Sequence, residues 1–226
     1  PVRRKPVVAI ISTGDELVMP GENPNTDQII ASNCFGLKAL LEDSGAAVRI
    51  LPIARDTSPA LQLSFDLAAQ ADLVVTIGGA SVGDHDLVAT AGRKMGLKKA
   101  FYKVAMRPGK PLMAGRINGT AMVGLPGNPV SAMVCGHIFL IPMICRMLGL
   151  PAQATAPMLA PLGCNTPQNG PREHYMRARF DNHQLVPFDR QDSALLTVLA
   201  HANALLVRAP HAPAQTKGTL VPYLVL

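Results

Sequence analysis

The fold is decided by a stretch near the start of the chain, residues 7–17, which read VVAIISTGDEL. Five apolar residues in a row, without polar alternation, are typical of a strand buried on both faces of a parallel sheet. The polar residues that follow, from Ser12 to Glu16, then lie at the carboxyl end of that strand. Ligands of open parallel sheets bind at this edge. Residues 7–17 therefore predict an α/β fold and the position of its site.

The alternation of strand and helix continues along the first two thirds of the chain. Asn118-Gly119 is a strong hairpin signal, and Ser32 is expected to cap the first helix. The pattern predicts a three-layer α/β/α domain with a mostly parallel sheet over residues 1–150. Further strands are expected over residues 48–52, 73–77, 110–116 and 120–125, and helices over residues 33–43, 58–69, 86–95 and 130–148.

The sequence changes character after residue 150. Four prolines between residues 151 and 167 indicate a linker, and short apolar or alternating runs follow it. Such runs predict a small β-barrel domain. We therefore expect two domains, an α/β domain over residues 1–150 and a β-barrel domain over residues 151–226.

The composition limits the partners of the protein. The formal net charge is +6, but the basic residues are scattered and only Arg3-Arg4-Lys5 forms a run. This distribution does not resemble a nucleic-acid-binding surface. A modest positive charge attracts small anions equally well. We therefore expect small anionic ligands and no nucleic-acid partner.

The apolar stretch over residues 133–150 is long enough to cross a membrane. Gly136, Pro142 and Arg146 interrupt it, so we expect a buried helix and no membrane partner. The four cysteines have no paired metal-ligand spacing, and no signal sequence opens the chain. These features predict no structural zinc and a reducing, cytoplasmic location.

Polar, glycine-rich loops follow the predicted strands at their carboxyl ends. Glycines allow the backbone to approach a ligand closely, and successive N–H groups can bind phosphate oxygens. The turn over residues 126–129 precedes the long helix and adds free N–H groups at the same edge. The alternative is that these loops are ordinary helix entries. The candidate substrate-binding residues are Thr13, Gly14, Asp15, Gly78, Gly79, Ser81, Gly83, Asp84, Pro126, Gly127, Asn128 and Pro129.

Three acidic residues, Glu16, Asp56 and Asp86, follow three different strands. Oxygen ligands from separate loops suit Mg²⁺, which is usually bound by one or two carboxylates together with phosphates and waters. The alternative is that they are solvated loop carboxylates, and Asp86 is also a candidate helix cap. Both interpretations stay open at this point.

Two cations lie three residues apart on a proline-glycine turn, Arg107-Pro108-Gly109-Lys110-Pro111. Prolines restrict the backbone, so the two charges are held in fixed positions. Two fixed cations suit a tetrahedral oxyanion. The alternative is a solvated turn with surface charges.

Four segments of the chain occur in the order of a known family. They are STGDEL at residues 12–17, GGASVGDHD at residues 78–86, PGKP at residues 108–111 and LPGNPVS at residues 125–131. Together they resemble the MoeA family of molybdopterin molybdenumtransferases, which is related to the E domain of gephyrin. The resemblance is specific over residues 7–150 and continues more weakly to the end of the chain.

The resemblance implies a reaction and its site residues. In the family, adenylylated molybdopterin is bound, molybdate is inserted into its dithiolene, and AMP is released in a step that needs Mg²⁺ or another divalent metal. Glu16, Asp56 and Asp86 match catalytic acids, of which Asp56 and Asp86 would hold the metal. Ser32 and Asn33 match a substrate-binding pair. The residues that match molybdate-binding positions are Arg107, Lys110, Ser131, Arg177 and Ser193.

The sequence departs from the family pattern in three respects. Ala31 stands where the family often has an acid, and Arg107 stands where lysine is usual. The family's two N-terminal domains are absent, and the resemblance implies that the full-length protein is a homodimer completed by them. Binding without turnover is therefore one expectation for this chain.

Two alternative functions remain. The first is the related molybdopterin adenylyltransferase, which shares the α/β domain but lacks the PGKP and LPGNP patterns. The second is a non-catalytic pterin-binding scaffold, against which the intact acids Glu16, Asp56 and Asp86 argue.

Overall fold

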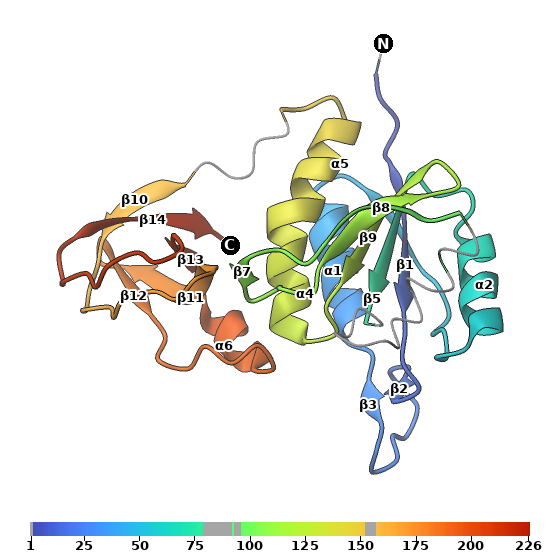
Figure 1. Cartoon of the computed structure of the whole chain (residues 1–226), viewed down its shortest axis with the longest axis horizontal. Coiled ribbons are helices and arrows are strands. Elements are labelled where there is room, and N and C mark those ends of the chain that lie inside the picture. The colour runs from blue at the N-terminus through green and yellow to red at the C-terminus, as the bar shows by residue number, and fades with distance from the viewer. Residues whose placement is uncertain (1, 79–91, 93–95, 152–156) are drawn as a thin grey trace.

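The computed structural model describes residues 2–78, 92, 96–151 and 157–226. Two main sheets lie side by side, joined by a helix-rich region (Figure 1). In the first sheet the first four strands are parallel to one another, and the fifth runs antiparallel to both of its neighbours. Their order is β4 (Ala47–Ile50), β1 (Val7–Ser12), β5 (Leu73–Ile77), β9 (Thr120–Leu125), β8 (Met113–Ile117) and β6 (Lys98–Tyr102).

Alternate residues of β1 enter two different cores because side chains of a strand point to opposite faces. Val8 and Ile10 pack with α1 (Asn33–Asp43) and the long helix that starts at Pro129. Ala9 and Ile11 pack with α2 (Ser58–Leu67) on the other face. The sheet is therefore covered on both faces (Figure 1). This confirms the predicted α/β fold with a mostly parallel sheet.

The helix entries differ in how they are capped. Thr57 caps α2, since its hydroxyl accepts a 3.4 Å hydrogen bond from the Ala60 N–H. Ser32 has helical backbone angles and makes no side-chain cap bond, so the prediction that it caps α1 is wrong. Its side chain is exposed beside a cavity. The bounds of α1 and β5 agree with the prediction, whereas α2 ends at Leu67. Of the helix expected over residues 86–95, only Gly92 lies within the described residues, and it is helical.

The long helix is continuous but not uniform. It comprises α4 (Pro129–Cys135), a π-helical turn η1 (Gly136–Leu140) and α5 (Ile141–Met147). Pro142 has no N–H, and the wider turn immediately precedes it. Within the described residues this helix alone has the length and apolarity of a membrane span. Val134, Leu140 and Ile144 lie in the core with β1, so it packs as a core helix.

Several short elements were not predicted. β6 contains two lysines and lies at the sheet edge, where charged residues prevent pairing with other chains. β7 (Met106–Arg107) is a two-residue strand, and β8 begins at Met113 rather than at Lys110 because residues 108–111 form a turn. β10 (Met158–Pro161) lies in the segment interpreted as a linker, and α6 (Leu196–His201) has no buried residue.

The second sheet agrees with the expected β domain. Its edge strands meet through a bridge between Leu162 and Leu185, and Ala178 and Leu206 belong to its separate core. β7 pairs in parallel with β11, so a strand from the first part of the chain extends this sheet. The remaining order is β10, β14 (Leu220–Val225), β13 (Ala204–Arg208), β11 (Glu173–Asp181) and β12 (Gln184–Pro187).

Candidate functional site

A first cavity, here called the strand-end cavity, lies at the carboxyl ends of β1 and β5. Its volume is about 220 Å³. Eight predicted site residues line it, from four separate segments of the chain: Thr13, Glu16, Ser32, Asn33, Gly78, Gly127, Asn128 and Pro129. Apolar walls come from Ile29 and Ile30, which are 59% and 45% exposed.

Main-chain contacts hold these loops together. Thr13 N–H donates a 2.9 Å hydrogen bond to the carbonyl of Ile77, and the Asn33 amide donates a 2.6 Å bond to the carbonyl of Gly127. Gly78 has φ +88°, and a Cβ there would lie 2.6 Å from the carbonyl oxygen of Thr13. Only glycine permits this close approach, so the strand end presents backbone directly to the cavity.

A second cavity, here called the cationic cavity, lies between the two sheets and has a volume of about 500 Å³. Its lining comes from the turn after β7, the entry of α4, the start of β11 and the loop after β12. Asn128 lines both cavities. The lining residues are Arg107, Pro108, Gly109, Lys110, Pro111, Pro126, Asn128, Ser131, Arg172, Gln191, Asp192 and Ser193.

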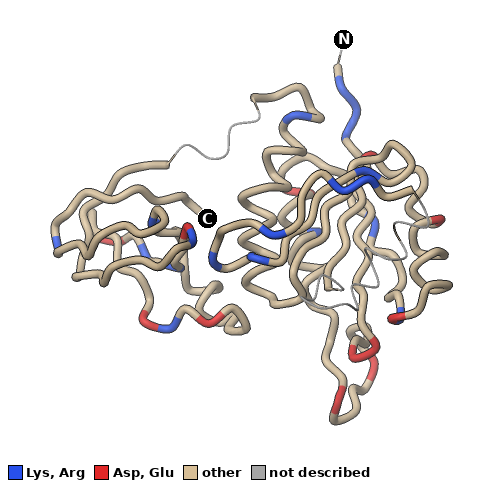
Figure 2. The backbone as a smooth tube through the Cα atoms, viewed as in Figure 1, with Lys and Arg blue, Asp and Glu red and all other residues tan. Residues whose placement is uncertain are grey.

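The charge of the cationic cavity is not balanced by ion pairs. Within the described ranges, neither Arg107, Lys110 nor Arg172 forms a salt bridge. Basic segments gather near β7, where it faces the second sheet (Figure 2). Burial and, after it, the charges of the surrounding arginines, Arg107 first among them, together lower the pKa of the nearby His174 from 6.5 to about 4. A cavity of this kind attracts anions.

Arg177 belongs to this region but does not line the cavity. It is fully buried on β11, and its Nη2 donates a 3.0 Å hydrogen bond to the carbonyl of Asp192, which is a lining residue. Its Nε and Nη1 have no hydrogen-bond partner within the described residues. Burial and then the charge of Arg107 lower the pKa of Arg177 to about 10. An unpaired buried guanidinium is costly unless an anion approaches it.

Acidic segments gather on the arm that carries β2 (Leu17–Val18) and β3 (Ile29–Ile30) (Figure 2). Asp15 and Glu16 immediately precede β2, and Asp56, between β4 and α2, lies against them. Asp56 N–H donates a 3.1 Å hydrogen bond to Asp15 Oδ1, and Arg55 donates a 2.7 Å bond to the carbonyl of Asp15. Burial raises the pKa of Asp56, and the charges of Asp15 and Glu16 raise it further. These carboxylates are therefore close enough to repel one another.

The acids fit a magnesium ion only in part. Among the described residues, no group of three or more His, Cys, Asp and Glu side chains could hold a metal ion. Oxygen donors with mutual repulsion nevertheless suit Mg²⁺, which needs few carboxylates when substrate phosphates and waters complete its shell. The predicted residues Gly79, Ser81, Gly83, Asp84 and Asp86 lie outside the described residues.

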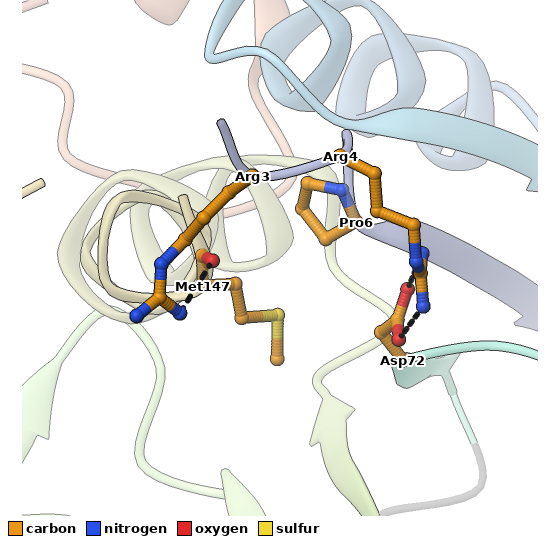
Figure 3. Close-up of a pocket in the computed structure, with 5 residues that line it drawn as sticks. All are labelled: Arg3, Arg4, Pro6, Asp72 and Met147. Atoms are coloured by element: carbon orange, nitrogen blue, oxygen red, sulfur yellow. Dashed lines mark hydrogen bonds and ion pairs between the residues drawn. The ribbon is translucent and has the colours of Figure 1, made fainter. Parts of the chain in front are cut away.

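A further cavity lies at the opposite end of the first sheet and is lined by the N-terminal segment (Figure 3). Arg4 forms two 2.6 Å hydrogen bonds with the carboxylate of Asp72. Arg3 donates to the carbonyl of Met147 at 3.4 Å. Both cations there have protein partners, whereas in the cationic cavity Arg172 has a 3.5 Å hydrogen bond to the carbonyl of Met106 but no carboxylate partner among the described residues.

Gln191, Asp192 and Arg172 line the cationic cavity but were not among the site residues predicted from the sequence. Arg172 could have been suspected as a basic residue at the start of a strand. The contribution of Gln191 depends on contacts with residues of another strand, and no local pattern signals it.

Two family models match the chain. Residues 9–146 match a model described as a probable molybdopterin binding domain, and residues 159–226 match one described as the MoeA C-terminal region (domain IV). The chain is 36% identical over 224 residues to molybdopterin molybdenumtransferase 2 of Mycobacterium tuberculosis, a match that covers 91% of this chain and 53% of that protein.

Two further comparisons agree with these. The chain is 32% identical over 226 residues to molybdopterin molybdenumtransferase of Bacillus subtilis, covering 96% of this chain and 51% of that protein. The crystal structure of a molybdopterin biosynthesis MoeA protein from Pyrococcus horikosii matches with a TM-score of 0.85 and 26% identity, over 98% of this chain and 54% of that one. The chain therefore spans about half the length of these relatives.

Proposed function

This chain belongs to the MoeA family of molybdopterin molybdenumtransferases, and on that premise we propose that it inserts molybdate into adenylylated molybdopterin with release of AMP. The observation that carries the proposal is the pair of adjoining cavities that share Asn128. One cavity has exposed backbone and apolar walls, and the other has unbalanced cations. Two cavities of different chemistry suit two substrates, a pterin nucleotide and a small oxyanion.

We assign the oxyanion to the cationic cavity. Arg107 and Lys110 carry positive charge there and form no salt bridge with the described residues, and Ser131 and Ser193 supply hydroxyl donors. Charge-assisted hydrogen bonds to a dianion such as molybdate are stronger than bonds between neutral groups. Arg177 adds two N–H-bearing nitrogens behind the lining, Nε and Nη1, that have no partner in the described part of the chain. Together these groups bind and orient molybdate.

We assign the pterin nucleotide to the strand-end cavity. Thr13, Asn33 and Gly78 offer polar groups and close backbone approach, and Ile29 and Ile30 offer apolar surface for a ring system. The other proposed substrate contacts are Gly14, Asp15, Ser32, Pro126, Gly127, Asn128 and Pro129, with Gly79, Ser81, Gly83 and Asp84 from the loop outside the described residues.

We propose that Glu16, Asp56 and Asp86 are the catalytic acids and that Asp56 and Asp86 hold Mg²⁺ or another divalent metal. The ion, when bound, would polarise the phosphate link of the nucleotide as a Lewis acid. Glu16 lines the strand-end cavity and would accept a proton from a water that attacks this phosphate link, whose P–O–P bond breaks to release AMP and leave the terminal phosphate on molybdopterin. Asn33 and Asn128 would orient the nucleotide between the acids and the oxyanion.

The proposal extends to the whole protein. Residues 1–150 would form the molybdopterin-binding domain and residues 151–226 the C-terminal β-barrel domain. The full-length protein would be a cytoplasmic homodimer, as the family resemblance implies.

Calorimetric titration of the chain with adenylylated molybdopterin, with and without Mg²⁺, tests the proposal. We expect micromolar or tighter binding of the nucleotide and separate binding of molybdate. AMP release in the presence of adenylylated molybdopterin, molybdate and Mg²⁺ would demonstrate turnover. Binding without AMP release would favour the scaffold alternative for this chain alone, and formation of the nucleotide from molybdopterin and ATP would favour the adenylyltransferase. A folded chain that binds neither ligand would refute the proposal.

A Lys110→Ala variant tests the division between the cavities. Lys110 lines the cationic cavity and not the strand-end cavity. We therefore expect molybdate to bind at least tenfold more weakly while the nucleotide binds with nearly unchanged affinity. Equal loss of both affinities would contradict the assignment.

A further inference from the structure

The carboxamide of Gln191 is inserted between two strands of the second sheet. β11 and β12 pair in antiparallel register up to Ala178 and Pro187. At the next pair, Phe188 N–H still donates to the carbonyl of Arg177 at 3.0 Å. An antiparallel pair of this type normally exchanges two such bonds. The second bond is replaced by the side chain of Gln191.

Both the oxygen and the nitrogen of this carboxamide form hydrogen bonds with main-chain groups of the two strands. Its Oε1 accepts a 2.9 Å bond from Arg177 N–H. Its Nε2 donates to the carbonyl of Arg177 at 2.9 Å and to the carbonyl of Phe188 at 2.7 Å. One glutamine therefore joins both main-chain groups of Arg177 to the chain that leaves β12.

Asp192 and Ser193, the two residues after Gln191, connect its side chain to other groups at the cationic cavity. The carbonyl of Asp192 accepts a 3.0 Å hydrogen bond from Arg177 Nη2. The carbonyl of Ser193 accepts a 3.1 Å bond from Val130 N–H, at the entry of α4. Gln191, Asp192 and Ser193 all line the cavity. The position of the Gln191 side chain thus sets where the guanidinium and the serine hydroxyl lie.

We propose that Gln191 is a positioning residue for the oxyanion: its carboxamide holds Arg177 and Ser193 at the cationic cavity without being required as an oxyanion ligand itself. This inference rests on the proposed function, because it takes molybdate to be the ligand of that cavity. It adds to that function the statement that Gln191 affects molybdate binding through Arg177 and Ser193.

No other side chain of similar size supplies the same contacts. Methionine has nearly the same length but neither an amide donor nor a carbonyl acceptor. Asparagine carries the amide on a side chain that is one methylene shorter, so it cannot reach both strands from the same backbone position. The three hydrogen bonds therefore require glutamine at this position.

The test compares Gln191→Met with Gln184→Met in the 226-residue chain. Gln184 is an exposed glutamine at the start of β12, remote from the lining of both cavities, and is the matched control. Calorimetry with sodium molybdate and, separately, with adenylylated molybdopterin measures the two affinities. We expect Gln191→Met to weaken molybdate binding at least tenfold, to change nucleotide binding by less than twofold, and Gln184→Met to change neither.

The outcomes separate the inference from the proposed function. A wild-type chain that binds no molybdate overturns the proposed function and the inference with it. Unchanged molybdate affinity in folded Gln191→Met overturns the inference alone, as does equal weakening of both ligands, which indicates a general structural role. Gln191→Asn keeps a polar side chain and replaces Gln191→Met if the latter does not fold. It is expected to show the same selective loss, and normal molybdate affinity in it also overturns the inference.

Discussion

The side-chain amide of Asn128 donates a 3.0 Å hydrogen bond to the hydroxyl of Ser193. These residues are 65 positions apart in the sequence. Asn128 lies at the entry of α4, beside the first sheet, and Ser193 lies in the loop after β12 of the second sheet. Asn128 lines both cavities, whereas Ser193 lines only the cationic one. This contact therefore joins the two proposed substrate sites through one side chain.

The asymmetry between Asn128 and Ser193 predicts different effects of truncation. Asn128→Ala is expected to weaken both the nucleotide and molybdate, since its side chain borders both ligands. Ser193→Ala is expected to weaken molybdate alone, by about five- to tenfold, the range for loss of one hydrogen bond of about 1 kcal/mol or slightly more. Titration of each variant with each ligand checks the prediction. Loss of nucleotide affinity in Ser193→Ala would show that the two sites are not separable in this way.

Replacement of Arg177 is expected to affect stability and molybdate binding in opposite directions. Its guanidinium is fully buried and two of its nitrogens have no partner within the described residues. Replacement of a poorly compensated buried charge by an apolar side chain is often neutral or stabilising by about 1–4 kcal/mol. We expect Arg177→Met to unfold at an equal or higher urea concentration than the wild type while losing most of its molybdate affinity. A strongly destabilised variant would indicate that the guanidinium contributes mainly to folding.

Much of the fold could be predicted because its central elements have strong local signals. β1 and β5 are continuous apolar runs, and Asn118 and Gly119 both adopt positive φ, at 48° and 84°, as a tight hairpin turn requires. β6 could not be predicted, because an edge strand needs no apolar pattern. β7 is a strand only because β11 lies beside it.

The site residues, like the strands and helices, could be predicted only where they belong to a local sequence pattern. Thr13, Gly78 and Lys110 were recognisable because turns and glycines at strand ends have their own sequence patterns, and the structure brings the first two to one cavity. Ser32 was misinterpreted as a cap because the same residue type serves both caps and binding sites. Gln191 could not be recognised, because its contacts are made with Arg177, which is 14 residues earlier on another strand.

His174 predicts how stability depends on pH. Burial, followed by the charges of Arg107, Arg177, Arg172 and Arg208, lowers its pKa from 6.5 to about 4. The unfolded chain therefore binds a proton below pH 6.5 that the folded chain does not bind until about pH 4, so the free energy of unfolding falls as the pH falls through this window. The loss attributable to His174 is at most about 3 kcal/mol.

A His174→Gln variant isolates this contribution. Urea unfolding at pH 7 and pH 5 measures the free energy of unfolding of both proteins. We expect the variant to lose less stability than the wild type between these pH values, because glutamine does not titrate. Identical losses in the two proteins would show that His174 is protonated in the folded state at pH 5.

Asp56 predicts a response to Mg²⁺. Burial and the neighbouring charges of Asp15 and Glu16 raise the pKa of Asp56, so its ionised form is disfavoured without a cation. Mg²⁺ that binds the folded chain would raise its melting temperature by mass action. Asp56→Asn removes one of the repelling charges, so we expect an equal or slightly higher melting temperature without Mg²⁺ and a smaller increase when Mg²⁺ is added with the nucleotide. Thermal unfolding of both proteins with and without millimolar Mg²⁺ measures this difference. Gln62→Ala, on the exposed side of α2, is the control, and an equal Mg²⁺ response in Asp56→Asn and the wild type would remove Asp56 from the metal site.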